Sequence, residues 1–373
     1  MRVAVASHPE RPDLLRDFAV ALRDDLRWAE ILDLLSPLAD RGGLTPALVC
    51  ELARAAIACG RPELALRVLD GQGAEAAPEM RGQRVLALYA LNRIDEARAA
   101  VAQVLAEDPD DEAVLDAFAD DCLQRGAAEA LVAVCRQGID GGACSSKYLA
   151  YLSAALALAD HRADVAALVD LERLCCRIEI ASGQVDNEEL VQAILTHPSI
   201  APSPEVKPTR GRNLRLTGLA SVEHPAISNL LAVIRPCIDA YLAERHDWPH
   251  PLFAHRPQAA WMQGWALVVS EDGYEETHIH PQGWLTAVYY ARVPQGVSRT
   301  EDHGAPPPGS IIFEAWPPSI RDSLPDFPNR HLEPCEGTLL IFPSFLGHRT
   351  IPTGVGELRI CAVLDIIPLF PAS

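Results

Sequence analysis

The segment from Tyr274 to Pro294, YEETHIHPQGWLTAVYYARVP, decides how the rest of the sequence is interpreted. Its second half is rich in Val and Tyr and predicts a β-strand. Its first half places His278 and His280 one residue apart. In an extended segment residues i and i+2 share a face, so both imidazoles can approach one ion from the same side. Glu276 is predicted to share that face. The segment therefore predicts a metal site on a β-sheet.

Similar short β segments surround it. They are AWMQGWALVVSEDG before it, and GSIIFEAW, CEGTLLIFPSFLGHRTIP and ELRICAVLDIIP after it, separated by Pro- and Gly-rich turns. Many short strands divided in this way are typical of a β-sandwich or jelly roll. The C-terminal half of the chain is thus predicted to be an all-β domain.

Two more residues fit a metal site. His348 follows an apolar strand and a Pro-containing turn, where a β-sandwich can place a side chain at its open end. Arg359 lies on the next predicted strand among apolar residues. A buried Arg needs an anionic partner, and its planar guanidinium suits a carboxylate. These residues predict a metal ion with a carboxylate co-substrate beside it, and imidazole-rich ligation suits Fe(II), Zn(II) or Cu(II).

The ordered motifs HIHPQGWLTAVYY, GSIIFEAW and EPCEGTLLIFPSFLGHRTIPTGVGELRICAVLD resemble the 2-oxoglutarate- and Fe(II)-dependent oxygenases, over Trp261 to Pro368. The resemblance implies a double-stranded β-helix, a jelly roll related to the cupins. It implies Fe(II) and 2-oxoglutarate as cofactors and O₂ as co-substrate. It assigns His278 and His348 as iron ligands and Arg359 as the anchor of the distal 2-oxoglutarate carboxylate. Tyr289 or Tyr290 would line the co-substrate pocket.

His280 departs from the pattern of that family, because it stands where the family usually has a carboxylate ligand. Three interpretations are open. Three neutral imidazoles, those of His278, His280 and His348, hold the metal; or His278 and His348 hold it with water or chloride in the third position; or Glu276 supplies the carboxylate. Trp284, next to the motif, is a predicted substrate contact.

The N-terminal half has a different character. It is rich in Ala and Leu with a helical period, and it repeats. Gly60, Asn92 and Gly126 mark equivalent turns, with Asp160 in a weaker fourth copy. Ala65, Ala97 and Ala130 follow the first three turns. This period resembles that of degenerate tetratricopeptide repeats, which are stacked helix pairs.

The predicted architecture is therefore an α+β multidomain chain. Residues 1–195 form a tetratricopeptide-like helical domain, residues 196–212 a Pro-rich linker, and residues 213–373 the double-stranded β-helix. The formal net charge of −19 argues against a nucleic-acid partner. No segment is apolar over the length of a membrane span. The ten cysteines form no disulfide framework, which favours a cytoplasmic protein.

The predicted function is hydroxylation of a peptide or protein side chain that the helical repeats recruit. Two alternatives remain at this stage. One is a small-molecule oxygenase of secondary metabolism whose helices form a homodimer. The other is a non-catalytic adaptor that combines the repeats with a cupin-like domain.

Overall fold

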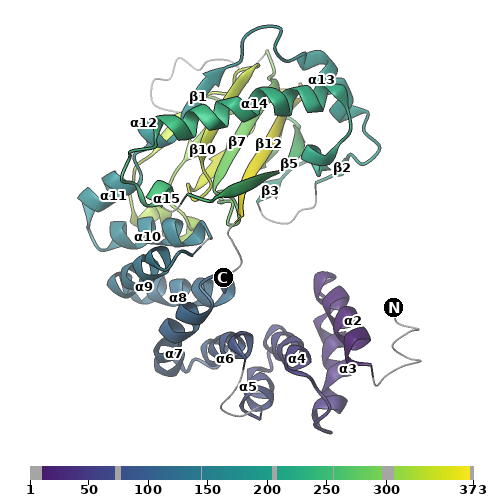
Figure 1. Cartoon of the computed structure of the whole chain (residues 1–373), viewed down its shortest axis with the longest axis vertical. Coiled ribbons are helices and arrows are strands. Elements are labelled where there is room, and N and C mark those ends of the chain that lie inside the picture. The colour runs from purple at the N-terminus through teal and green to yellow at the C-terminus, as the bar shows by residue number, and fades with distance from the viewer. Residues whose placement is uncertain are drawn as a thin grey trace. The chain divides into compact units, whose positions relative to one another are not determined.

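The computed structural model describes residues 11–71, 77–143, 145–203, 208–254, 256–295 and 306–369. The chain divides into two compact units, residues 1–127 and 128–373, and Figure 1 labels their helices and several of the strands. The described part of the first unit is helical. Its helices are α2 (Pro12–Asp24), α3 (Trp28–Ala39), α4 (Pro46–Ala58), α5 (Pro62–Asp70), α6 (Pro78–Ala90), α7 (Ile94–Glu107) and α8 (Glu112–Arg125).

The predicted repeat appears in the backbone of the turns. Every predicted turn residue adopts a left-handed conformation, and Leu26 does so as well: the positions are Leu26, Gly60, Asn92, Gly126 and Asp160, with φ between 56° and 69°. Leu26 reveals an additional copy that the sequence hides, because a bulky residue occupies a position that favours Gly or Asn. The helical repeat is thus confirmed as a periodic turn, whereas membership of the tetratricopeptide class stays a prediction.

The buried position of the third copy differs from the prediction. Ala65 and Ala97, each five residues after a turn, are completely buried. Five residues after Gly126 comes Leu131, which is also completely buried, whereas Ala130 is exposed. The buried position of the third copy was therefore placed one residue too early, and it is occupied by Leu131 and not by a small residue. One residue rotates a side chain by about 100° around a helix.

The second unit combines helices with sheets. The helices are α9 (Ala128–Asp140), α10 (Lys147–Leu158), α11 (Arg162–Leu168), α12 (Leu171–Leu174), α13 (Asn187–Leu195), α14 (Pro225–Glu244) and α15 (Pro251–Ala254), with short 3₁₀ turns at Leu219–Ser221 and Pro318–Ser323. The helix α14 lies across one face of the large sheet (Figure 1). Its buried residues Ile227, Leu230, Ile234, Ile238 and Tyr241 form one stripe.

Among the helices described, α14 is the one whose length and composition would suffice for a membrane span. The Tyr241 hydroxyl donates a hydrogen bond to the carbonyl of Leu174 (2.9 Å), which ties the buried stripe to the rest of the unit. A single apolar stripe is the pattern of a helix that covers a core. We therefore describe α14 as a core helix.

The large sheet has seven antiparallel strands in the order β1-β10-β7-β12-β5-β4-β2. Their bounds are β1 (Cys176–Glu179), β2 (Ala201–Pro202), β4 (Asn213–Thr217), β5 (Ala259–Val269), β7 (Leu285–Arg292), β10 (Thr338–Pro343) and β12 (Arg359–Leu369). Smaller sheets contain β11 (His348–Thr350), β8 (Ile311–Phe313) and β9 (Arg330–Leu332), and β3 (Thr209–Arg210) with β6 (Tyr274–Glu275). A sheet region is thus present in the C-terminal part of the chain as predicted, but the predicted β domain also contains the helices α14 and α15, so it is not all-β.

The domain boundaries differ from the prediction of a helical domain to residue 195 and a linker over 196–212. The strand β1 lies inside the predicted helical domain and pairs with β10. The predicted linker contributes β2 and β3, which pair with β4 and β6. These strands are only two to four residues long, too short for a local pattern to reveal them, and the partners of β1 and β3 lie far along the chain.

Candidate metal centre

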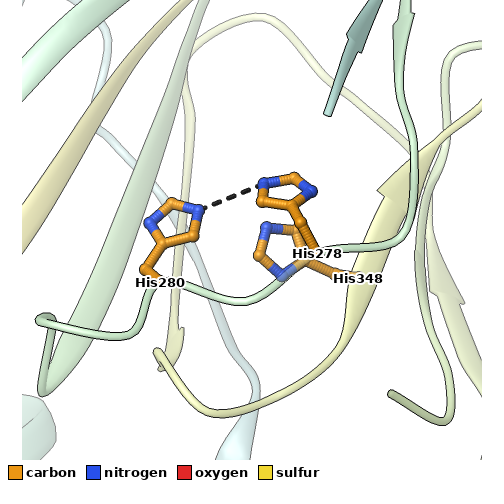
Figure 2. A group of neighbouring side chains, drawn as sticks. All are labelled: His278, His280 and His348. Carbon is orange, nitrogen blue, oxygen red and sulfur yellow. Dashed lines mark hydrogen bonds between the residues drawn. The ribbon is translucent and has the colours of Figure 1, made fainter. Parts of the chain in front are cut away.

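The structure brings His278, His280 and His348 together (Figure 2), with one ring nitrogen from each within 4.8 Å of the others. His278 and His348 face each other in an isolated antiparallel bridge and exchange two backbone hydrogen bonds of 2.9 Å. His280 is held by its backbone N–H, which donates to the carbonyl of Ser344 (3.0 Å). The segment with His278 and His280 is therefore not a regular strand, because it forms an isolated bridge followed by a turn. The i, i+2 spacing nevertheless directs both imidazoles to the same side.

The hydrogen bonds of the three rings orient them. The Nδ1 of His278 lies 2.7 Å from the carbonyl oxygen of Glu276, and that of His348 lies 2.9 Å from the carbonyl oxygen of Leu346. The Nδ1 of His280 lies 2.5 Å from Oδ1 of Asp365. A carbonyl oxygen and a carboxylate only accept, so each Nδ1 carries the proton and donates it. Each Nε2 therefore presents a lone pair.

Two of these lone pairs face each other. The Nε2 atoms of His278 and His280 are 3.3 Å apart (Figure 2), a separation that one proton or one metal ion between them can bridge. Two ligand nitrogens about 2.1 Å from one metal ion would be about 3.0 Å apart at a right angle and about 3.4 Å at a tetrahedral angle. The observed separation fits a shared cation, which would remove the repulsion between the lone pairs.

Burial keeps the rings of His278 and His348 neutral. Burial, with the neighbouring His280 as a secondary cause, lowers the pKa of His278 to about 3. Burial also lowers the pKa of His348 well below its usual value. Because a metal binds the neutral imidazole, both side chains are in the ligand form at neutral pH.

Asp365 is a supporting residue that the sequence analysis missed. It lies on β12 and accepts hydrogen bonds from His280 Nδ1 and from the Thr286 hydroxyl (3.0 Å). The Thr286 hydroxyl in turn lies 2.8 Å from that of Ser344. A carboxylate behind a ligating imidazole fixes the ring and increases its basicity. A metal held by three neutral imidazoles has one negative charge fewer around it than a metal held by two imidazoles and a carboxylate. The carboxylate of Asp365, bonded to His280, places a negative charge behind that ligand.

Asp365→Asn should weaken metal binding about 10–100-fold, the effect typical of removing such a supporting group. The amide can still accept from Nδ1, so the change removes charge more than shape. The dissociation constant for Co(II), measured by competition with a chromogenic chelator, tests this. The control is Asp322→Asn, because the Asp322 side chain is 98% exposed. Equal Co(II) affinity of both variants would show that Asp365 does not support the site.

Arg359 is buried as predicted, with 2% of its surface exposed. Its Nη1 donates to the carbonyl of Gly309 (2.8 Å) and its Nη2 lies 3.4 Å from the Thr350 hydroxyl, while its Nε has no hydrogen-bond partner. No carboxylate of the described residues forms an ion pair with it. A buried guanidinium with an unsatisfied N–H is suited to an anionic ligand.

The two candidate tyrosines point to opposite faces of β7. Tyr290 is opposite Cys361 and is 2% exposed, on the same face as Arg359. The hydroxyl of Tyr289 donates to Asn187 of α13 (2.7 Å), which places it on the helix-covered face. Tyr290 therefore remains a candidate for the co-substrate pocket, and Tyr289 does not.

Of the two acidic residues before the histidine motif, Glu275 is buried and Glu276 is partly exposed. The Glu276 side chain is 43% exposed and forms an ion pair with Arg210 (2.7 Å), so it does not supply the missing carboxylate ligand. Glu275, by contrast, is 8% exposed and accepts a hydrogen bond from the Thr209 hydroxyl (2.8 Å). The regular strand β6 ends at Glu275, so the strand spacing that would place Glu276 beside His278 does not apply there.

Trp284 also points away from the predicted site. Its indole N–H donates to the carbonyl of Leu252 (3.0 Å). It lines a cavity of about 410 Å³ together with Leu149 and Pro251, and none of the three histidines lines that cavity. Trp284 is therefore not the predicted substrate contact beside the metal.

Residues 263–365 match the family model described as "Putative 2OG-Fe(II) oxygenase". This span contains all three histidines, Arg359 and Asp365. No curated protein matches the chain in sequence. The resemblance stated from the motifs is confirmed by the family match. Enzymes of this family use Fe(II) and 2-oxoglutarate, and the donor set described above fits both.

Several solved structures are similar over about half of the chain. A prolyl-4-hydroxylase from Pseudomonas putida is 14% identical over 54% of this chain and 96% of its own, with a TM-score of 0.37. A prolyl hydroxylase from Trichoplax adhaerens, in complex with a peptide fragment, is 13% identical over 56% and 90%, also with a TM-score of 0.37. HygX from Streptomyces hygroscopicus, with nickel and 2-oxoglutarate bound, is 16% identical over 54% and 86%, with a TM-score of 0.35. At these scores the assignment depends on the family match and the side-chain geometry.

Proposed function

We propose that this chain, whose residues 263–365 match the 2OG-Fe(II) oxygenase family model, is an enzyme that hydroxylates a peptide or protein side chain. In this proposal His278, His280 and His348 hold Fe(II), and Arg359 binds the distal carboxylate of 2-oxoglutarate. The observation that carries this proposal is the convergence of three imidazoles whose Nδ1 atoms bond elsewhere, with the Nε2 atoms of His278 and His280 3.3 Å apart.

The chain's own residues have distinct tasks in this proposal. When bound, Fe(II) and 2-oxoglutarate supply the activation of O₂, with succinate and CO₂ as the co-products. Arg359 fixes the co-substrate from the buried end of the sheet. Asp365 keeps the proton on Nδ1 of His280 and so keeps its Nε2 free. The apolar walls around Phe313 and Phe342, whose rings lie 6.1 and 5.0 Å from that of His348, exclude water.

The helical repeats support a peptide substrate. Stacked helix pairs commonly present extended binding surfaces for peptides. Eight cysteines in the described part of the chain are free, namely Cys50, Cys59, Cys122, Cys175, Cys176, Cys237, Cys335 and Cys361, which is compatible with the cytoplasm as the proposed location. A small-molecule oxygenase that dimerises through its helices and a non-catalytic adaptor are the alternatives.

Succinate formation separates these possibilities. We expect the protein, incubated with Fe(II), 2-oxoglutarate and ascorbate, to release succinate slowly alone and faster with a peptide pool that contains its substrate. A mass increase of about 16 Da on a peptide would identify hydroxylation. Succinate without any effect of peptides would favour the small-molecule alternative. No succinate and no bound metal in the purified protein would favour the adaptor.

A further inference from the structure

The sheet face that carries Arg359 and Asp365 extends from the metal site toward the solvent. Directly opposite residues of antiparallel strands point to the same face. Leu267 of β5 is opposite Cys361 of β12, so Leu267, Trp265 and Trp261 share the face of Arg359. Exposure rises along β5, from 0% at Val269, opposite Arg359, to 47% at Trp261. Arg359 thus lies at the closed end and Trp261 at the open end.

Arg215 lies between these ends. It is on β4, opposite Leu267, and therefore projects from the same face. Its guanidinium carbon is 4.2 Å from the centroid of the Trp265 ring. The Trp265 ring is in turn 5.5 Å from the ring of His280. The Trp265 ring therefore lies between the Arg215 guanidinium and the candidate metal ligand His280, and Arg215 lies nearer the solvent-exposed end of this sheet face.

Arg215 has no anionic partner in the described part of the chain. The two nearby carboxylates are engaged elsewhere: Glu275 accepts from Thr209, and Asp365 accepts from His280 and Thr286. Burial lowers the pKa of Arg215, against the opposing effects of Glu275 and Asp365. Partly desolvating a guanidinium without a direct ion pair is costly, and this cost is recovered when an anion binds.

We propose that Arg215, held on Trp265, is a substrate subsite for a carboxylate, so that the enzyme acts on a peptide with an acidic side chain close to the oxidised residue. This inference rests on the proposed function and deepens it. It also separates the tasks of two cations, since Arg359 at the closed end serves the co-substrate and Arg215 nearer the opening serves the substrate. The protein's net charge of −19 repels acidic peptides in general. A preference for them therefore requires a local cation.

The test is selection from a random peptide library on the full-length protein, loaded with Ni(II) and N-oxalylglycine as unreactive substitutes for Fe(II) and 2-oxoglutarate. We expect the wild-type protein to enrich peptides with Asp or Glu at one position. The enriched peptide should bind about 10–100-fold more weakly to Arg215→Met, which keeps the apolar contact with Trp265 and removes the charge. Arg215→Glu should instead enrich Lys or Arg at that position.

Arg212→Glu is the matched control for Arg215→Glu. Arg212 is exposed and lies three residues from Arg215, and both substitutions change the net charge of the protein by the same amount. It should retain the acidic preference. The inference is overturned if the wild-type protein shows no acidic enrichment or if Arg215→Met binds the enriched peptide unchanged. It is also overturned if Arg215→Met weakens 2-oxoglutarate binding as strongly as Arg359→Ala does. By contrast, acidic enrichment without succinate formation or peptide oxidation would count against the proposed function alone.

Discussion

His348→Ala abolishes the binding of Fe(II) or Co(II) by this protein in our account. The loss should exceed the roughly 10–100-fold effect expected for a supporting residue such as Asp365, because a ligand itself is removed. His278→Ala should behave in the same way, since the two residues oppose each other across one backbone bridge. Metal content after dialysis and the Co(II) dissociation constant are the measurements.

The matched control for this experiment is His250→Ala. His250 is buried like His348, at 1% and 4% exposure. Its Nε2 donates to the carbonyl of Leu168 (3.0 Å), and its Nδ1 accepts from the N–H of Leu252 (3.1 Å), so neither nitrogen is free for a metal. This variant should lose stability and keep the metal. Retained stoichiometric metal in His348→Ala would show that His348 is not a ligand.

Arg359→Ala raises the 2-oxoglutarate requirement by about 30-fold or more, the usual consequence of truncating one member of a buried charge pair. Arg359→Lys should restore only part of the affinity, because an ammonium cannot reproduce the two parallel hydrogen bonds of a guanidinium. The concentration of 2-oxoglutarate that gives half-maximal succinate formation measures this effect, and titration of the Ni(II)-loaded protein measures binding directly.

Arg321→Ala serves as the control for Arg359→Ala. The Arg321 side chain is 45% exposed, and its partner is Glu314 at 3.2 Å, so the substitution removes a positive charge outside the proposed pocket. Its 2-oxoglutarate requirement should stay within about twofold of that of the wild-type protein. An unchanged requirement in Arg359→Ala would contradict the assignment of Arg359 as the co-substrate anchor.

The principal site residues could be predicted because each leaves a local mark in the sequence. His278 and His280 have strand spacing, and Arg359 interrupts an apolar strand. Asp365 leaves a similar mark, because it is a charged residue in the same apolar strand. It lies six residues after Arg359 and hence on the same face. Its position in the sequence therefore predicts a buried functional side chain for the same reason as that of Arg359.

Other features depend on tertiary structure. Strand alternation places Tyr289 and Tyr290 on opposite faces, but only the packing of α13 shows which face the helices cover. Arg215 lies on a strand of five residues at the start of the predicted β domain, and its role appears only once β4 pairs with β5. Glu276 was misplaced because the regular strand β6 ends at Glu275.

The central claim is that His280 is a metal ligand in the position where a carboxylate usually stands. A crystal structure of the protein with Fe(II) or Ni(II), with the ion located by its anomalous scattering, tests it most directly. We predict that the Nε2 atoms of His278, His280 and His348 all lie about 2.0–2.3 Å from the ion. A metal held by His278 and His348, with water or chloride in the third position and His280 Nε2 more than about 3 Å away, would contradict the claim.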